Sequence, residues 1–149
     1  MTVKKMFLNV LFITVVLSLT SCGAFADYAL PENDVRELND AVRKSLRECN
    51  YNFVVLGHTQ LIAGQEPSRQ WFDVHAGLCV TRFERVIYLA ENLRSKAELP
   101  RHRDSLDSTI RMFNQEIQMV EFLRACYGRA EDRAAKLGCF KQAFNLMPR

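Results

Sequence analysis

Apolar residues at spacings of three and four recur along the chain from residue 35 onward, and this feature most limits what it can fold into. Such spacing places side chains on one face of an α-helix, whereas a half-buried strand needs strict alternation, which is absent here. The first stripe consists of Val35, Leu38, Val42, Leu46, Cys49, Phe53 and Leu56. The pattern therefore predicts an all-α protein.

The first two helices are predicted over about residues 34–63 and 68–99. Pro31 and the acidic residues after it form a helix start signal. Gly64 ends the first helix, because glycine readily adopts the left-handed conformation found just beyond helix ends. Pro100 is expected to end the second helix, since proline has no backbone N–H to donate.

Two further helices follow a basic link over residues 100–103. Asp104 or Ser105 can cap the third helix, which Gly128 ends, and a shorter fourth helix is expected from about Ala130 to Met147. Short loops between long helices make neighbours antiparallel. The predicted architecture is therefore an up-down four-helix bundle.

The first 26 residues have the layout of a cleaved signal peptide. Lys4 and Lys5 precede an uncharged apolar run over residues 6–19, which is too short to span a bilayer and is followed by small residues. The remainder, residues 27–149, is expected to be a single helical domain exported from the cytoplasm.

Two cleavage sites compete at the end of this leader. Residues 19–22, Leu-Thr-Ser-Cys, resemble the bacterial lipobox, which implies cleavage before Cys22 and lipidation of that cysteine. Residues 24–26, Ala-Phe-Ala, instead form a site for ordinary signal peptidase, which would release a soluble protein starting at Asp27. We favour the lipoprotein hypothesis because a cysteine with suitable predecessors is rarer by chance than two alanines.

The charge of the mature chain is close to neutral. The full sequence has 20 Lys and Arg against 17 Asp and Glu, and removing the two leader lysines leaves 18 against 17. A nucleic-acid-binding protein usually carries a basic patch or a strong positive excess. The composition therefore argues against a nucleic-acid partner.

Four cysteines remain in the mature chain, an even number as disulfide pairing in an exported protein requires. Cys49 and Cys79 each lie fifteen residues from Gly64, so an antiparallel hairpin places both roughly 20 Å from its turn. Cys126 lies off the stripe of the third helix, and Cys139 follows across a polar connection. Among the three possible connectivities we predict Cys49–Cys79 and Cys126–Cys139, both structural because the sequence has no C-x-x-C motif.

Several catalytic and cofactor motifs are missing from the sequence. It has no C-x-x-C-H haem motif, no E-x-x-H for a di-iron bundle and no H-E-x-x-H zinc motif. G-x-S-x-G, P-loop and EF-hand patterns are also missing. We therefore expect a non-catalytic protein without a resident cofactor.

His58 and His75 are the weak candidates for a metal site. They flank the predicted turn at Gly64, and with Glu66 or Asp73 they would supply suitable ligands for a divalent metal. His58, however, points away from the stripe of its helix. One exposed histidine and one partly buried polar contact are therefore the simpler interpretation, and no metal is predicted.

A binding surface is predicted at the Gly64 end of the bundle, where apolar residues lie off the main stripes of the first two helices. A helix that buries one face has no need of such residues, so they indicate a docking surface with Trp71 as its anchor. The alternative is that both helices are central and bury these residues internally. The predicted partner-binding residues are Val55, Ile62, Arg69, Trp71, Val74, Leu78, Arg82 and Arg85.

The functional hypothesis is a non-catalytic helical binding protein of the periplasm or of the outer membrane facing the periplasm, or one that is secreted. An immunity protein or an accessory lipoprotein for secretion or assembly would suit this size and compartment. Its partner would be another envelope or secreted protein, with membrane contact only through a lipid on Cys22. The alternative is a carrier that holds haem, a metal or an apolar ligand within the bundle.

Overall fold

The structure, a computed structural model, describes residues 30–146, so the predicted signal peptide, Cys22 and Met147 lie outside the described part. Within that range all regular elements are helical and no strand occurs, as predicted. The elements are α2 (Glu32–Ser45), the π-helix η3 (Leu46–Val55), α3 (Leu56–Ile62), α4 (Arg69–Lys96), α5 (Pro100–Arg129) and α6 (Arg133–Leu146).

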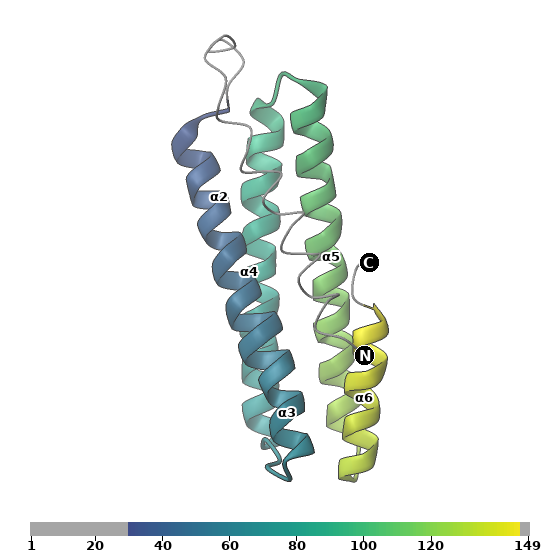
Figure 1. The fold of residues 1–149 in the computed structure, drawn as a ribbon. Helices are drawn as coiled ribbons and strands as arrows, with labels where there is room; N and C mark the ends of the chain where they lie inside the picture. The colour runs from purple at the N-terminus through teal and green to yellow at the C-terminus, as the bar shows by residue number, and fades with distance from the viewer. Residues whose placement is uncertain (1–29, 147–149) are drawn as a thin grey trace.

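α2, η3 and α3 follow one another without a break and form a single rod over residues 32–62, called the first rod below (Figure 1). It ends at Gly64, whose φ of 85° is in the left-handed region that favours glycine. The Gly64 N–H donates to the Leu61 carbonyl at 3.2 Å, and the Gln65 N–H donates to the Gln60 carbonyl at 2.9 Å. This pair of bonds is the Schellman motif, so the predicted stop at Gly64 is confirmed.

The π-helix changes which residues of the first rod are buried. Every fourth residue from Ser45 to Leu61 is buried, including Gly57, whereas Leu56 of the predicted stripe is 39% exposed. In a regular α-helix these four-residue steps would rotate the buried face by about 160° between the two ends. The wider π turn offsets that rotation, because its hydrogen bonds join residues five apart. The predicted stripe is therefore wrong at Leu56, since it assumed a constant helical period.

α4 begins where the sequence predicts, but α5 begins earlier. The Ser68 hydroxyl accepts a hydrogen bond from the Trp71 N–H at 3.1 Å and caps α4. The expected link and the cap at Asp104 or Ser105 are wrong, because α5 already starts at Pro100. Proline is well suited to the first helical position, where its missing N–H would have no helical partner.

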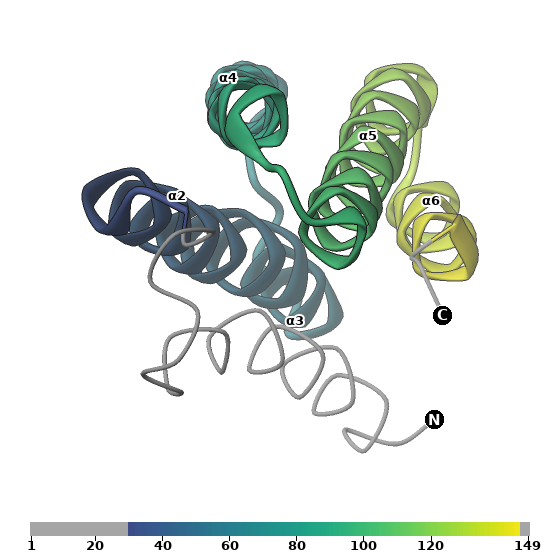
Figure 2. The same ribbon diagram turned by 90° about the horizontal axis from the view of Figure 1, so that it is seen from above.

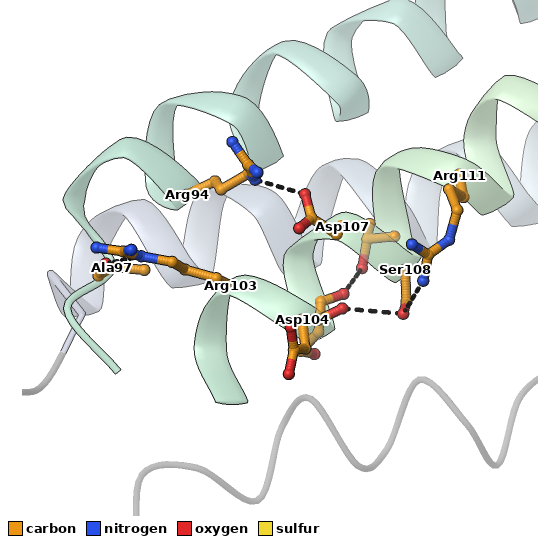
Figure 3. Close-up of polar contacts among 9 residues, drawn as sticks. Arg94, Ala97, Arg103, Asp104, Asp107, Ser108 and Arg111 are labelled. Carbon is orange, nitrogen blue, oxygen red and sulfur yellow. Dashed lines mark hydrogen bonds and ion pairs between the residues drawn. The ribbon is translucent and has the colours of Figure 1, made fainter. Parts of the chain in front are cut away.

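The short connection between α4 and α5 is held by polar contacts (Figure 3). Arg103 Nε donates to the Ala97 carbonyl at 2.7 Å, which satisfies a backbone group just beyond α4. Arg94 Nε lies 2.5 Å from Asp107 Oδ1 and joins the two helices by an ion pair. These contacts fix α4 and α5 as an antiparallel hairpin.

Successive helices run antiparallel, with α4 between the first rod and α5 (Figures 1 and 2). α6 has 14 residues and α5 has 30, so α6 covers only the half of α5 nearest the Gly64 end. The bundle therefore has four helices at that end and three at the other. The sequence predicted a short fourth helix, but it did not predict that the bundle has four helices at one end and three at the other.

An aromatic cluster fills the four-helix end, with one ring from each of the four helices. Phe72 of α4 stacks on Tyr127 of α5 at 4.0 Å between centroids. Phe53 of the first rod lies 4.8 Å from Phe72, and Phe140 of α6 lies 6.0 Å from it. A Cβ at Gly57 would lie 3.6 Å from Phe140 Cζ, which is an ordinary van der Waals distance, so α6 packs directly against α3 at this point.

Both predicted disulfides are present. Cys49–Cys79 joins η3 to α4 with 5.5 Å between Cα atoms, and Cys126–Cys139 joins α5 to α6 with 5.7 Å. Both spacings are typical of disulfides. Two disulfides in a chain of this size are typical of proteins from a non-reducing, exported environment.

Candidate functional site

The eight predicted partner-binding residues differ in side-chain exposure and in the residues that they contact. Ile62, Val74 and Leu78 remain 56%, 53% and 49% exposed, which is high for large apolar side chains. Val74 and Leu78 are one turn apart on α4, whereas Ile62 is the last residue of α3. The Ile62 carbonyl accepts a hydrogen bond from Arg133 of α6, which places it beside a different helix.

One face of α4 carries two of the exposed apolar residues that were predicted, Val74 and Leu78, together with Tyr88, which was not predicted. Residues at spacings of three and four share one face of a helix. Val74, Leu78 and Tyr88 lie on this face and are all exposed. A Cβ added at Gly77, between the first two, would meet no atom within 4 Å.

Trp71 and Val55 are half-buried, and Trp71 packs against the core. The Trp71 indole lies 6.1 Å from the Phe53 ring and stacks on the His75 ring at 4.0 Å. The indole therefore contributes to packing between α4 and the first rod, and only part of its surface faces solvent. This arrangement gives it a smaller share of any docking surface than the sequence predicted.

Two of the predicted arginines have partners within the chain. Arg82 forms an ion pair with Glu48, and Arg85 forms one with Glu37. Both pairs join α4 to the first rod on the side that carries the Cys49–Cys79 disulfide. Arg69, the first residue of α4, is exposed.

Other apolar residues that lie off the predicted stripes are internal. Val54 and Leu61 of the first rod are fully buried, and Leu89 of α4 is 6% exposed. For these residues the internal-packing alternative is correct. The first rod contacts α4 and also, near Gly64, α6, so it buries more than one face.

The two histidines near the turn have separate partners. His58 lies against α6, 5.4 Å from the Phe140 ring and 5.2 Å from the Phe144 ring. Burial lowers the pKa of His58, and the nearby charge of Lys141 lowers it further. His75 lies over Trp71 of its own helix, with Nδ1 2.8 Å from the Trp71 carbonyl oxygen. Among residues 30–146 no group of three or more His, Cys, Asp or Glu is placed to hold a metal ion.

A buried polar pair that the sequence analysis missed lies near the Cys49–Cys79 disulfide. Asn50 Nδ2 of η3 donates to Glu116 Oε1 of α5 at 3.1 Å. The two remaining polar atoms of the pair, Asn50 Oδ1 and Glu116 Oε2, are buried without a hydrogen-bond partner. Burial raises the pKa of Glu116 to about 7, against the smaller lowering effect of the Asn50 hydrogen bond. A carboxyl group is thus held in the core with half of its hydrogen-bonding capacity unused.

The sequence contains a signal for Glu116 but not for Asn50. Phe113, Glu116, Val120 and Leu123 follow spacings of three, four and three, so a glutamate occupies a core position of the α5 stripe. Asn50 meets it from the π-helical segment of the first rod, and the apolar pattern does not predict that segment.

His102, which was predicted to lie in the basic link over residues 100–103, is also a buried polar residue. It lies in the first turn of α5, is 5% exposed, and its Nδ1 has no hydrogen-bond partner. Burial lowers the pKa of His102, and the charge of Arg101 adds to this effect. A neutral imidazole at the three-helix end is therefore favoured.

Comparisons of the chain with protein-family models, with curated proteins and with solved structures found no match. No helix within residues 30–146 is both long enough and apolar enough to cross a membrane.

Proposed function

We propose that this protein is an exported, non-catalytic binding protein that docks another envelope or secreted protein on the face of α4 that carries Val74 and Leu78. The observation that carries the proposal is the exposure of Val74 and Leu78, which are 53% and 49% exposed on one face of a helix. The two side chains are one turn apart and so form a small continuous apolar patch, and exposed apolar patches on proteins often serve as interaction sites.

A helix of the partner suits this face best. Gly77 lies between Val74 and Leu78, and the space above it is open to at least 4 Å. A small residue at that point allows another backbone to approach α4 closely, while the two apolar side chains flank the contact. Recognition by an amphipathic helix relies on anchors at these spacings.

The disulfides support the binding role in two ways. They are typical of an exported environment, in which envelope or secreted partners are available. The Cys49–Cys79 bridge also lies one residue beyond Leu78, so it stiffens α4 directly behind the proposed face. A rigid surface loses less entropy on binding than a mobile one.

In this proposal the chain is tethered to a membrane only through a lipid on Cys22, and it acts as an immunity protein or as an accessory lipoprotein for secretion or assembly. The carrier alternative has less support. At the four-helix end the rings of Phe53, Phe72, Tyr127 and Phe140 pack against one another, so side chains of the protein fill this part of the bundle.

Paired aspartate substitutions test the docking face. We expect Val74→Asp with Leu78→Asp to reduce recovery of one stoichiometric partner from envelope extract by more than about tenfold, because each anchor contributes roughly 1 kcal/mol or more. The matched control places the same two charges at Gln115 and Gln118, which are exposed on α5. Equal recovery by all three proteins, or equal loss in the control, would contradict the proposal.

A further inference from the structure

The two free oxygens of the buried polar pair belong to side chains that already share one hydrogen bond. Asn50 Nδ2 donates to Glu116 Oε1, which leaves Asn50 Oδ1 and Glu116 Oε2 without partners. Both atoms are acceptors when the carboxyl group is ionised, so neither can satisfy the other. A single proton on Oε2 is the smallest addition that satisfies both.

We propose that a proton on Glu116 Oε2 donates to Asn50 Oδ1, so that the two side chains form a reciprocal acid–amide pair that locks η3 to α5 in a pH-dependent manner. The pair then makes two hydrogen bonds, one donated by each residue. Loss of the proton leaves a buried negative charge opposite an amide oxygen, which weakens the contact between the first rod and α5.

The surroundings of Glu116 favour the neutral form. The side chain is 3% exposed, and Phe113 and Val120, its neighbours one turn away on α5, are fully buried. On η3 the charged residue nearest Asn50 in sequence is Glu48, and on α4 the one nearest Cys79 is Arg82, and these two pair with each other. Arg47 of η3 lies 3.9 Å from Glu48 as well. On α5 itself, the charged residues nearest in sequence are Arg111 and Glu121, both exposed.

The expected pH dependence follows from the two states of the protein. Burial raises the pKa of folded Glu116 to about 7 from its ordinary 4.5, so the folded state holds the proton more tightly than the unfolded state does. Stability from this group is therefore fully present below about pH 4.5 and is lost as the pH rises through about 7. Between about pH 5 and pH 8 the unfolding equilibrium constant should rise on the order of 100-fold because of this group alone.

Glu116→Gln tests the proposal, because glutamine has the same shape and its amide donates to Asn50 Oδ1 at every pH. We expect the variant to lose most of this rise when urea unfolding is followed from pH 5 to pH 8 with both disulfides intact. Glu121→Gln, at an exposed position of the same helix, should keep the full rise.

A direct titration makes the test independent of whether the variant folds. The side-chain carboxyl carbon of Glu116 in the unaltered protein, followed by NMR, should titrate near neutral pH. Titration at the ordinary glutamate value, or a pH dependence unchanged by Glu116→Gln, would overturn the proposal.

Discussion

Replacing the cysteines of one disulfide at a time should show that the two bridges stabilise the fold unequally. The Cys49–Cys79 bridge closes a loop with a sequence separation of 30, and the Cys126–Cys139 bridge closes one with a separation of 13. A crosslink restricts the unfolded chain more when it closes a longer loop. Alanine at both cysteines of the first bridge should therefore cost more stability than at both cysteines of the second.

The loop lengths give the expected magnitudes. The chain-entropy relation predicts a loss of about 3.6 kcal/mol for Cys49–Cys79 and about 2.9 kcal/mol for Cys126–Cys139. Burial widens this gap, because Cys49 and Cys79 are 0% and 2% exposed whereas Cys126 is only half-buried. For a domain of this size these losses correspond to falls in melting temperature of about 14 °C and about 11 °C.

Thermal unfolding, monitored by far-ultraviolet circular dichroism, measures the fall in melting temperature for each of the two double variants. Urea unfolding of the two double variants and of the unaltered protein then gives the free energies of unfolding directly. The second variant serves as the matched control for the first, because both remove two cysteines and one crosslink. An equal or larger loss on removing Cys126–Cys139 would refute the reasoning from loop length.

Two further predictions concern the turn and the leader. Gly64→Ala should destabilise the protein by about 1–2 kcal/mol in urea unfolding, because φ at this position is 85°. Gly138→Ala should be neutral or stabilising, because Gly138 lies in the middle of α6 and a Cβ there would meet no atom within 4 Å. A loss of stability in both variants would contradict this assignment of strain. Cys22→Ser should release the protein from membranes into the soluble fraction on fractionation; soluble wild-type protein that starts at Asp27 would instead establish cleavage after Ala26.

The sequence predicts local features of this fold well because neighbouring residues decide them. The cap at Ser68 and the left-handed turn at Gly64 depend on backbone groups within a few positions. The disulfide pairing follows from helix rise and distance from the turn, as the bridge between Cys49 and Cys79 demonstrates. The early start of α5 at Pro100 was missed because proline both ends and begins helices, and the apolar pattern does not distinguish these roles.

The tertiary structure decided which of the predicted partner-binding residues stay exposed, and it brought the buried polar pair together. Leu61 is buried and Leu78 is 49% exposed, although both are leucines that lie off the predicted stripes near Gly64. Which of them meets a neighbour depends on where the other helices pass, and no local pattern encodes that. Asn50 contacts Glu116 from the π-helical segment of the first rod, and the apolar pattern does not predict that segment.

The sequence alone therefore determined the helical class, the turn at Gly64 and the two crosslinks, because helix period and chain geometry act over short distances. Only the tertiary structure decided that α6 covers half the length of α5. It also decided that the carboxyl group of Glu116 lies in the core of the bundle. Burial arises from contacts between helices distant in the sequence, and Asn50 and Glu116 are 66 residues apart.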